Sequence, residues 1–276
     1  MIDIIKDTLF DSIKLLPFLF LAYLLMEYLE HKTGNKTKDI VKKSGKLGPL
    51  WGGIIGIFPQ CGFSAAAANL YAGKIITMGT LIAVFLSTSD EMLPILISEA
   101  APASLILKVL AIKLVVGIIA GFIIDLVINV IGKTKKVEPE EAVGHMCEHD
   151  HCDCEHGIFK SALKHTINIF IFITIITFAI NTLIHFIGEE TIEKAIAGVP
   201  VLGILVSSIF GLIPNCAGSV IITELYLSNL ISFGSMIAGL LVGSGIGILV
   251  LFKSNKNIKE NLTITGLLML VGIIVG

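Results

Sequence analysis

Two cysteines lie within strongly apolar segments, and each follows a proline at the same spacing. One is in Pro59-Gln60-Cys61-Gly62 and the other is in Pro214-Asn215-Cys216-Ala217. Polarizable thiolate sulfur binds soft or borderline metals and metalloids much better than it binds hard calcium or magnesium. The amide between each proline and cysteine adds a donor and an acceptor that could orient an oxyanion or a metal-bound water. A single membrane cysteine is usually a packing residue, but this matched pair predicts a substrate site made by both thiols.

A second cluster of polar residues lies in the third apolar segment and reads Ser87-Thr88-Ser89-Asp90-Glu91. Because an ionisable group inside a membrane is costly, its default interpretation is functional, although two hydrated carboxylates near the outer surface are the alternative. The corresponding stretch, Gly243-Ser244-Gly245, is uncharged but rich in glycine, which favours local unwinding. We expect a broken, substrate-facing helix in each half of the chain, and we expect Lys113 to pair with one of the two acids.

Further oxygen ligands are expected from Ser64 and Ser219, which follow the two cysteines at the same distance, and from Glu224. Glu224 aligns with Asn69 and is either a proton or cation site or a side chain that reaches the membrane surface. Hard ions such as manganese prefer oxygen ligands. A manganese site would therefore use the two acids of the third segment together with Glu224 and the two amides beside the cysteines.

A polar tract between the two halves is rich in metal-ligating side chains. Its histidines and cysteines are His145, Cys147, His149, His151, Cys152, Cys154 and His156. This composition is typical of metal binding, but it does not match a zinc finger, which needs two ligand pairs separated by a longer packed segment. We expect a flexible capture or sensing loop whose thiols are free in the reducing cytoplasm. A metal-binding loop on that side favours export.

The composition places these residues in a membrane. Of the 276 residues, 54% are hydrophobic and only 15% are charged, which is too apolar for a water-soluble globule of this size. The 20 basic residues, all lysine, are outnumbered by 22 acidic ones, which excludes a basic surface for nucleic acid. Apolar segments near the roughly 20 residues needed to cross a bilayer predict an all-α polytopic membrane protein. The eight segments are 9–29, 47–72, 75–97, 104–131, 161–187, 200–227, 231–251 and 261–276.

The lysines predict the orientation of the chain. Short lysine-rich loops stay in the cytoplasm, and the loops that fit this rule together are 31–46, 132–160 and 252–260. They lie on one side only if segments 47–72 and 200–227 enter and return on the same side, as re-entrant or broken hairpins. The N-terminus then lies on the outer side of the cytoplasmic membrane. An acidic start without a small-residue cleavage site predicts that the first helix is not a removable signal peptide.

The two halves are copies of one unit. An offset of 155 residues, 214 minus 59, superimposes the two Pro-x-Cys motifs and pairs Leu70-Tyr71 with Leu225-Tyr226 without a gap. We expect a first repeat, a cytoplasmic linker and a second repeat, at 1–131, 132–160 and 161–276. With the hairpins, the repeats have opposite orientation and hold five elements each, about ten in all. Inverted repeats are typical of secondary transporters, whose substrate binds near the midplane where broken helices meet.

The same motifs carry a family resemblance. The chain resembles the ArsP-like ten-helix heavy-metal exporters in four stretches. These are Phe58-Pro59-Gln60-Cys61-Gly62-Phe63-Ser64, Asn69-Leu70-Tyr71-Ala72-Gly73, the Ser87–Glu91 cluster and the second Pro-x-Cys motif. The resemblance covers about 47–97 and 200–250. It implies ten membrane elements and metal export, and the Cys/His tract is similar to the variable loop between the halves of such proteins. Members are described as arsenic efflux proteins or as manganese transporters, so the resemblance leaves the substrate open.

We therefore expect a secondary-active exporter of a soft heavy metal or metalloid in the lipid bilayer. Inorganic arsenite prefers three thiolates and the membrane offers two, which favours a trivalent organoarsenical or an uncharged hydroxide; manganese or another divalent metal is the alternative. No P-loop is present, so we expect proton or membrane-potential coupling and no permanently bound cofactor. The lack of a CxxC motif, a cofactor signature and a neighbouring base argues against an enzyme. A membrane metal sensor is a less favoured alternative, because it would not need inverted hairpins. The predicted arrangement of the hairpins is compatible with a homodimer.

Overall fold

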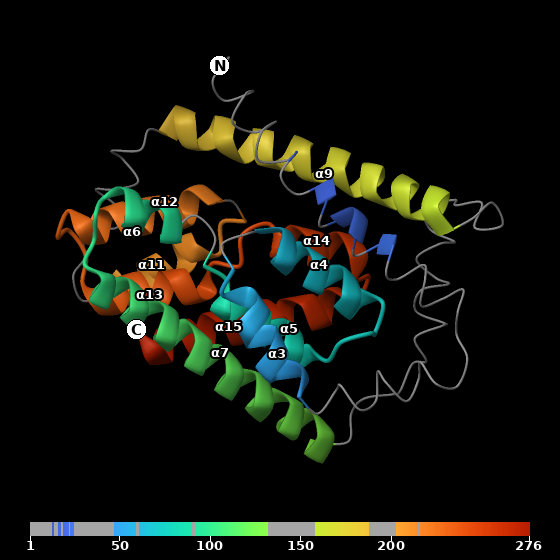
Figure 1. Cartoon of the computed structure of the whole chain (residues 1–276), viewed down its shortest axis with the longest axis horizontal. Coiled ribbons are helices and arrows are strands. Elements are labelled where there is room, and N and C mark those ends of the chain that lie inside the picture. Colours follow the sequence, from blue (N-terminus) through green and yellow to red (C-terminus); the bar gives the residue numbers. More distant parts are fainter. Residues whose placement is uncertain are drawn as a thin grey trace.

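The computed structural model describes residues 13, 16–17, 19–21, 23–24, 47–58, 61–89, 92–131, 158–187, 203–214 and 216–276. Every regular element in these ranges is an α-helix, so the chain is an all-α polytopic membrane protein, as the hydropathy pattern predicts. The helices are α3 (Gly48–Gly56), α4 (Cys61–Ala72), α5 (Met78–Ser87), α6 (Met92–Ser98), α7 (Ala103–Ile131), α9 (Ile158–Ile187), α11 (Gly203–Gly211), α12 (Cys216–Leu227), α13 (Phe233–Val242), α14 (Gly247–Ser254) and α15 (Ile258–Val275). Figure 1 shows the long helices α7 and α9 on opposite sides of a body of shorter helices.

The helices of the second half lie where the sequence offset places them. Adding 155 to the bounds of α3, α4 and α5 gives the bounds of α11, α12 and α13. The same shift carries the first residues of α6 and α7 onto the first residues of α14 and α15. The two halves therefore share one series of helices and breaks. Their opposite orientation across the membrane, and the domain division at 132–160, stay predictions.

Local signals give the two copies the same helix ends. Thr77 and Ser232, at the starts of α5 and α13, each accept a hydrogen bond from the backbone N–H three residues on, at 3.1 Å, as N-cap residues do. α4 and α12 are each followed by a left-handed residue, Lys74 at φ 57° and Asn229 at φ 58°. In both, the next N–H donates to the carbonyl five residues back, at 2.9 Å. This Schellman pattern ends each helix and turns the chain toward the next one.

Glycines bring the backbones of neighbouring helices into close contact in both copies. A Cβ built on Gly121 of α7 would lie 2.6 Å from the carbonyl oxygen of Gly79 in α5. One built on Gly276, which follows α15 at the equivalent position, would lie 2.7 Å from the carbonyl oxygen of Gly234 in α13. Small residues at such positions allow membrane helices to approach closely. The contacts fix α5 against α7 and α13 against α15.

Five stretches of the described chain are long and apolar enough to cross a membrane, and all five coincide with predicted apolar segments. Two of them, Met78–Ser98 and Phe233–Ser254, contain a helix break and are 75% and 89% buried inside the protein. The other three, Ala103–Val130, Ala162–Ala179 and Ile258–Val275, are unbroken and at most 29% buried. The broken helices therefore form the centre of the protein, and the unbroken ones form the surface that faces the lipid.

The arms of the two predicted hairpins are short. α3 and α11 have 9 residues each, and α4 and α12 have 12. These lengths correspond to about 14 Å and 18 Å at 1.5 Å per residue, against about 30 Å of hydrocarbon. No single arm can therefore cross the bilayer, which agrees with a hairpin that enters and returns.

Each hairpin packs against the broken helix of the other copy. The returning arm α4 packs on α14, and its counterpart α12 packs on α6. In Figure 1, α4 and α14 lie together on one side of the body, and α6 and α12 lie together on the other. α5 and α13 also contact each other between them. Because of this exchange, residues from both copies surround the helix breaks.

Candidate functional site

The two predicted thiol ligands occupy the same place in two helices. Cys61 is the first residue of α4 and Cys216 is the first residue of α12, so each follows the break in its hairpin. The first turn of a helix has unpaired N–H groups and the positive end of the helix dipole, which together favour an anion. The predicted amide ligands Gln60 and Asn215 lie outside the described residues.

The hydroxyl residues at the end of α5 bond to the backbone. Ser87 and Thr88 donate to carbonyls of the preceding turn, each at 2.7 Å. Ser89 donates to the carbonyl of Ile57, the residue that ends α3. All three hydroxyl residues are buried. Of these three predicted substrate ligands, Ser89 therefore joins the break between α5 and α6 to the break between α3 and α4.

We expect Ser89→Ala to lower the free energy of unfolding by about 1–3 kcal/mol, because the carbonyl of Ile57 would lose a buried donor. The matched control is Ser244→Ala at the equivalent position of the second copy, where the hydroxyl has no hydrogen-bond partner within the described residues. Thermal unfolding of both variants in detergent, with choline chloride as the added salt, would compare their stabilities. An equal effect of the two substitutions would show that the bond to Ile57 contributes nothing to stability.

Ser64 and Ser219 come to one break from opposite copies. A Cβ built on Gly247, the first residue of α14, would lie 2.9 Å from Cβ and 3.1 Å from Oγ of Ser64. A Cβ built on Gly243, at the end of α13, would lie 3.5 Å from Oγ of Ser219. Both serines are buried. The structure therefore places both of these predicted site residues beside the second break, one at each end of it.

Lys113 crosses from one copy to the other. It lies on α7, only 1% of its surface is exposed, and its ammonium donates to the carbonyl of Leu240 in the last turn of α13. The expected partners Asp90 and Glu91 lie outside the described residues, so their pairing with Lys113 stays a prediction. The observed bond places a positive charge at the negative end of the α13 dipole.

Asn69 and Glu224 hold equivalent positions in α4 and α12 but have different surroundings. Asn69 is fully buried, and its Oδ1 accepts hydrogen bonds from Tyr23 at 3.2 Å and from Ser254 at 2.7 Å. The side chain of Glu224 is exposed on α12. Asn69 therefore joins the first hairpin to the end of α14 in the second copy. The predicted role of Glu224 as a proton or cation site stays a prediction.

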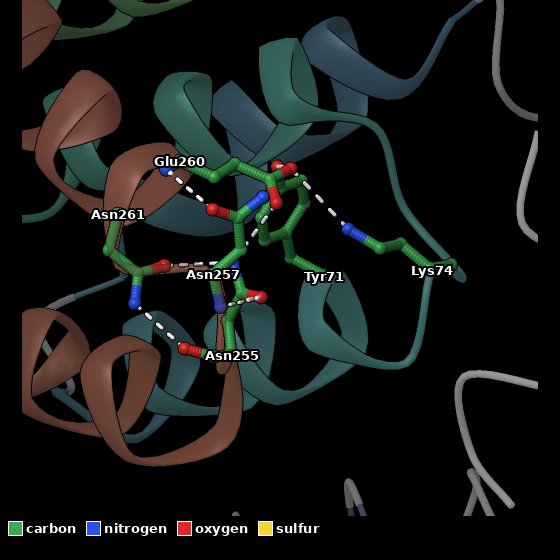
Figure 2. A network of polar contacts seen from close by, with 6 residues as sticks. All are labelled: Tyr71, Lys74, Asn255, Asn257, Glu260 and Asn261. Atoms are coloured by element: carbon green, nitrogen blue, oxygen red, sulfur yellow. Dashed lines mark hydrogen bonds and ion pairs between the residues drawn. The ribbon is translucent and has the colours of Figure 1, made fainter. Parts of the chain in front are cut away.

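A polar network that the sequence analysis missed joins α4 to the start of α15 (Figure 2). The carboxylate of Glu260 accepts hydrogen bonds from the hydroxyl of Tyr71 and, at 3.4 Å each, from Lys74 and Asn255. Asn255 in turn donates to the side-chain oxygen of Asn261, and the amide of Asn261 donates to the backbone carbonyl of Asn255, both at 2.8 Å. The network links the two copies at one end of their interface. No local sequence pattern relates residue 71 to residue 260.

The Cys/His tract at 145–156 lies outside the described residues, and its predicted metal binding stays a prediction. Within the described ranges, no group of three or more His, Cys, Asp or Glu side chains is arranged to hold a metal ion. The ligands that the described part of the chain brings together around the second break are therefore hydroxyl and backbone oxygen atoms.

Comparison with known proteins agrees with the resemblance found in the motifs. A family model described as "Putative, 10TM heavy-metal exporter" matches residues 1–186 and also residues 165–276, which together cover the whole chain. Searches among curated proteins and among solved structures gave no match. Within the described residues, five helices lie before the linker (α3 to α7) and six lie after it (α9 and α11 to α15), which is consistent with a polytopic helical membrane protein.

Proposed function

We propose that this chain, which belongs to the family of ten-transmembrane heavy-metal exporters, is a secondary-active exporter of a trivalent organoarsenical or a similar soft metalloid. The substrate binds between the two hairpins, with Cys61 and Cys216 as its soft ligands. The family membership supports metal export, and the choice of a soft substrate rests on the chemistry of the two thiols.

The observation that carries the proposal is the matched place of the two cysteines. Each begins the returning arm of a hairpin, one in α4 and one in α12. A helix start stabilises a thiolate, which is the form of cysteine that binds metals. Because α4 and α12 each pack on the broken helix of the opposite copy, a movement of one copy relative to the other would change the surroundings of both thiols. Such coupled movement is what alternating access requires.

Two thiols match one class of substrate better than another. A trivalent arsenic centre that carries one methyl group has two remaining valences for sulfur, whereas inorganic arsenite prefers three thiolates. Manganese would instead use oxygen ligands, and the acidic side chains of Asp90, Glu91 and Glu224 make manganese the second candidate. The two candidates depend on different side chains, so transport measurements can distinguish them.

The test is uptake into everted membrane vesicles that contain the protein, with methylarsenite and manganese(II) measured in parallel. We expect methylarsenite to accumulate when an ion gradient is present and to stop accumulating when the gradient is dissipated. Vesicles without the protein are the control. Manganese accumulation without methylarsenite accumulation would contradict the soft-metalloid proposal and favour an oxygen-lined site, and accumulation of neither would contradict export of both cargoes.

A further inference from the structure

Ser244 is a buried hydroxyl at the centre of the protein that has no partner in the described part of the chain. It lies in the unwound segment between α13 and α14, beside Gly245, whose φ of 53° is a left-handed conformation. None of its surface is exposed, and its Oγ makes no hydrogen bond within the described residues. A buried hydroxyl left unpaired is energetically unfavourable. Its equivalent in the first copy, Ser89, has a partner in the carbonyl of Ile57.

Among the described residues, the three atoms nearest to a Cβ built on Gly243 are all uncharged oxygen atoms. A Cβ built on Gly243 would lie 3.3 Å from the carbonyl oxygen of Gly239, 3.5 Å from Oγ of Ser219 and 3.7 Å from the carbonyl oxygen of Gly211. Gly239 belongs to the last turn of α13, and Gly211 is the last residue of α11. Two helix C-termini, each the negative end of a dipole, therefore meet beside Gly243, the residue before Ser244.

Hydroxyl and carbonyl oxygens at the C-termini of broken helices are the ligands by which membrane transporters hold sodium. The three described atoms nearest to a Cβ on Gly243 include no sulfur, which a soft metal prefers, and no carboxylate, which calcium and magnesium usually take. The surrounding stretch, Phe233–Ser254, is 89% buried, so little water competes for the ion. We propose that a sodium ion binds at the break between α13 and α14, with Ser244 and Ser219 among its ligands.

The ammonium of Lys113 limits how tightly this site can bind sodium. It donates to the carbonyl of Leu240, one residue after Gly239, so the same helix end already attracts one positive charge. Repulsion between the two cations weakens sodium binding, and we expect saturation only at high sodium concentration. The role of this sodium ion in transport rests on the proposed exporter function, in which sodium, rather than a proton, is the coupling ion. Sodium binding itself requires no cargo, so it can be tested separately.

The experiment measures thermal unfolding of the purified full-length protein in detergent as sodium chloride replaces choline chloride at constant ionic strength. We expect sodium to raise the unfolding temperature by several degrees, because a ligand that binds only the folded state stabilises it. Ser244→Ala is expected to abolish this rise while leaving the unfolding temperature in choline unchanged or higher. Ser208→Ala is the matched control, since that hydroxyl donates to the carbonyl of Ile204 in its own helix at 2.7 Å.

A second variant, Ser219→Ala, keeps the test informative if Ser244→Ala does not fold, and it is expected to weaken the sodium effect. Potassium chloride in place of sodium chloride should give a smaller rise. The proposal is wrong if the wild type shows no sodium-dependent rise, if potassium gives an equal one, or if Ser244→Ala keeps it. A sodium effect on stability in a protein that moves no metalloid would contradict the proposed cargo and leave the sodium site standing.

Discussion

Replacing either hairpin cysteine by serine is expected to reduce methylarsenite uptake at least about 100-fold, because loss even of the partners that orient metal ligands typically costs 10–100-fold. Serine keeps the size of the side chain and removes the soft sulfur. Cys61→Ser and Cys216→Ser should each have nearly the full effect, since a two-coordinate site that loses one thiolate holds the arsenic by a single bond. Initial uptake rates in everted vesicles, normalised to the amount of protein, would measure the loss.

The control for this prediction is Ser208→Ala, which removes a hydroxyl bonded within its own helix and is expected to leave uptake unchanged. The unfolding temperature of each cysteine variant should stay close to that of the wild type. Normal methylarsenite uptake in the double variant would contradict the thiol mechanism and indicate that both cysteines are packing residues. Manganese uptake that is unchanged by the substitutions would indicate that the transport site uses oxygen ligands instead of the two thiols.

The sequence was informative where a structural feature depends on residues close together in the chain. Pro59 and Pro214 predict the two hairpin breaks, and the threonine and serine caps at 77 and 232 set the starts of α5 and α13. Because these signals recur at one offset, the helix bounds recur at the same offset. The breaks after α5 and α13 follow from hydroxyl-rich and glycine-rich segments that favour unwinding.

The sequence was less informative where a contact joins the two copies. The substrate role of Ser89 stays a prediction, but no local pattern predicts that its hydroxyl donates to the carbonyl of Ile57, which needs a donor because it lies at a broken helix end. Ser64 and Ser219 align in the repeat, but Ser64 reaches the second break because α4 packs on α14 of the other copy, whereas Ser219 lies beside the end of α13 in its own copy. Repeat alignment pairs equivalent positions, whereas the interface joins positions that are not equivalent.

The contact between α5 and α7 provides the second prediction of large effect. A Cβ at Gly121 would lie 2.6 Å from the carbonyl oxygen of Gly79, 2.8 Å from Cβ of Pro49 and 3.0 Å from Cβ of Ala83. None of these atoms belongs to the end of a flexible side chain, so the helices themselves would have to separate. We expect Gly121→Ala to lower the free energy of unfolding by about 3 kcal/mol, the upper end of the usual cost of overpacking.

Gly266→Ala is the matched control for this prediction, because Gly266 also lies within a long membrane helix and a Cβ there would meet nothing within 4 Å. Alanine should leave the stability unchanged or raise it by up to about 1 kcal/mol through its better helix propensity. SDS titration of both variants in mixed micelles separates propensity from packing, since the backbone change is the same. If Gly121→Ala were as stable as Gly266→Ala, α5 and α7 would not be held at the distance that the glycines allow. Because α5 leads directly into the break that Ser89 joins to the first hairpin, we expect uptake by Gly121→Ala to fall together with its stability.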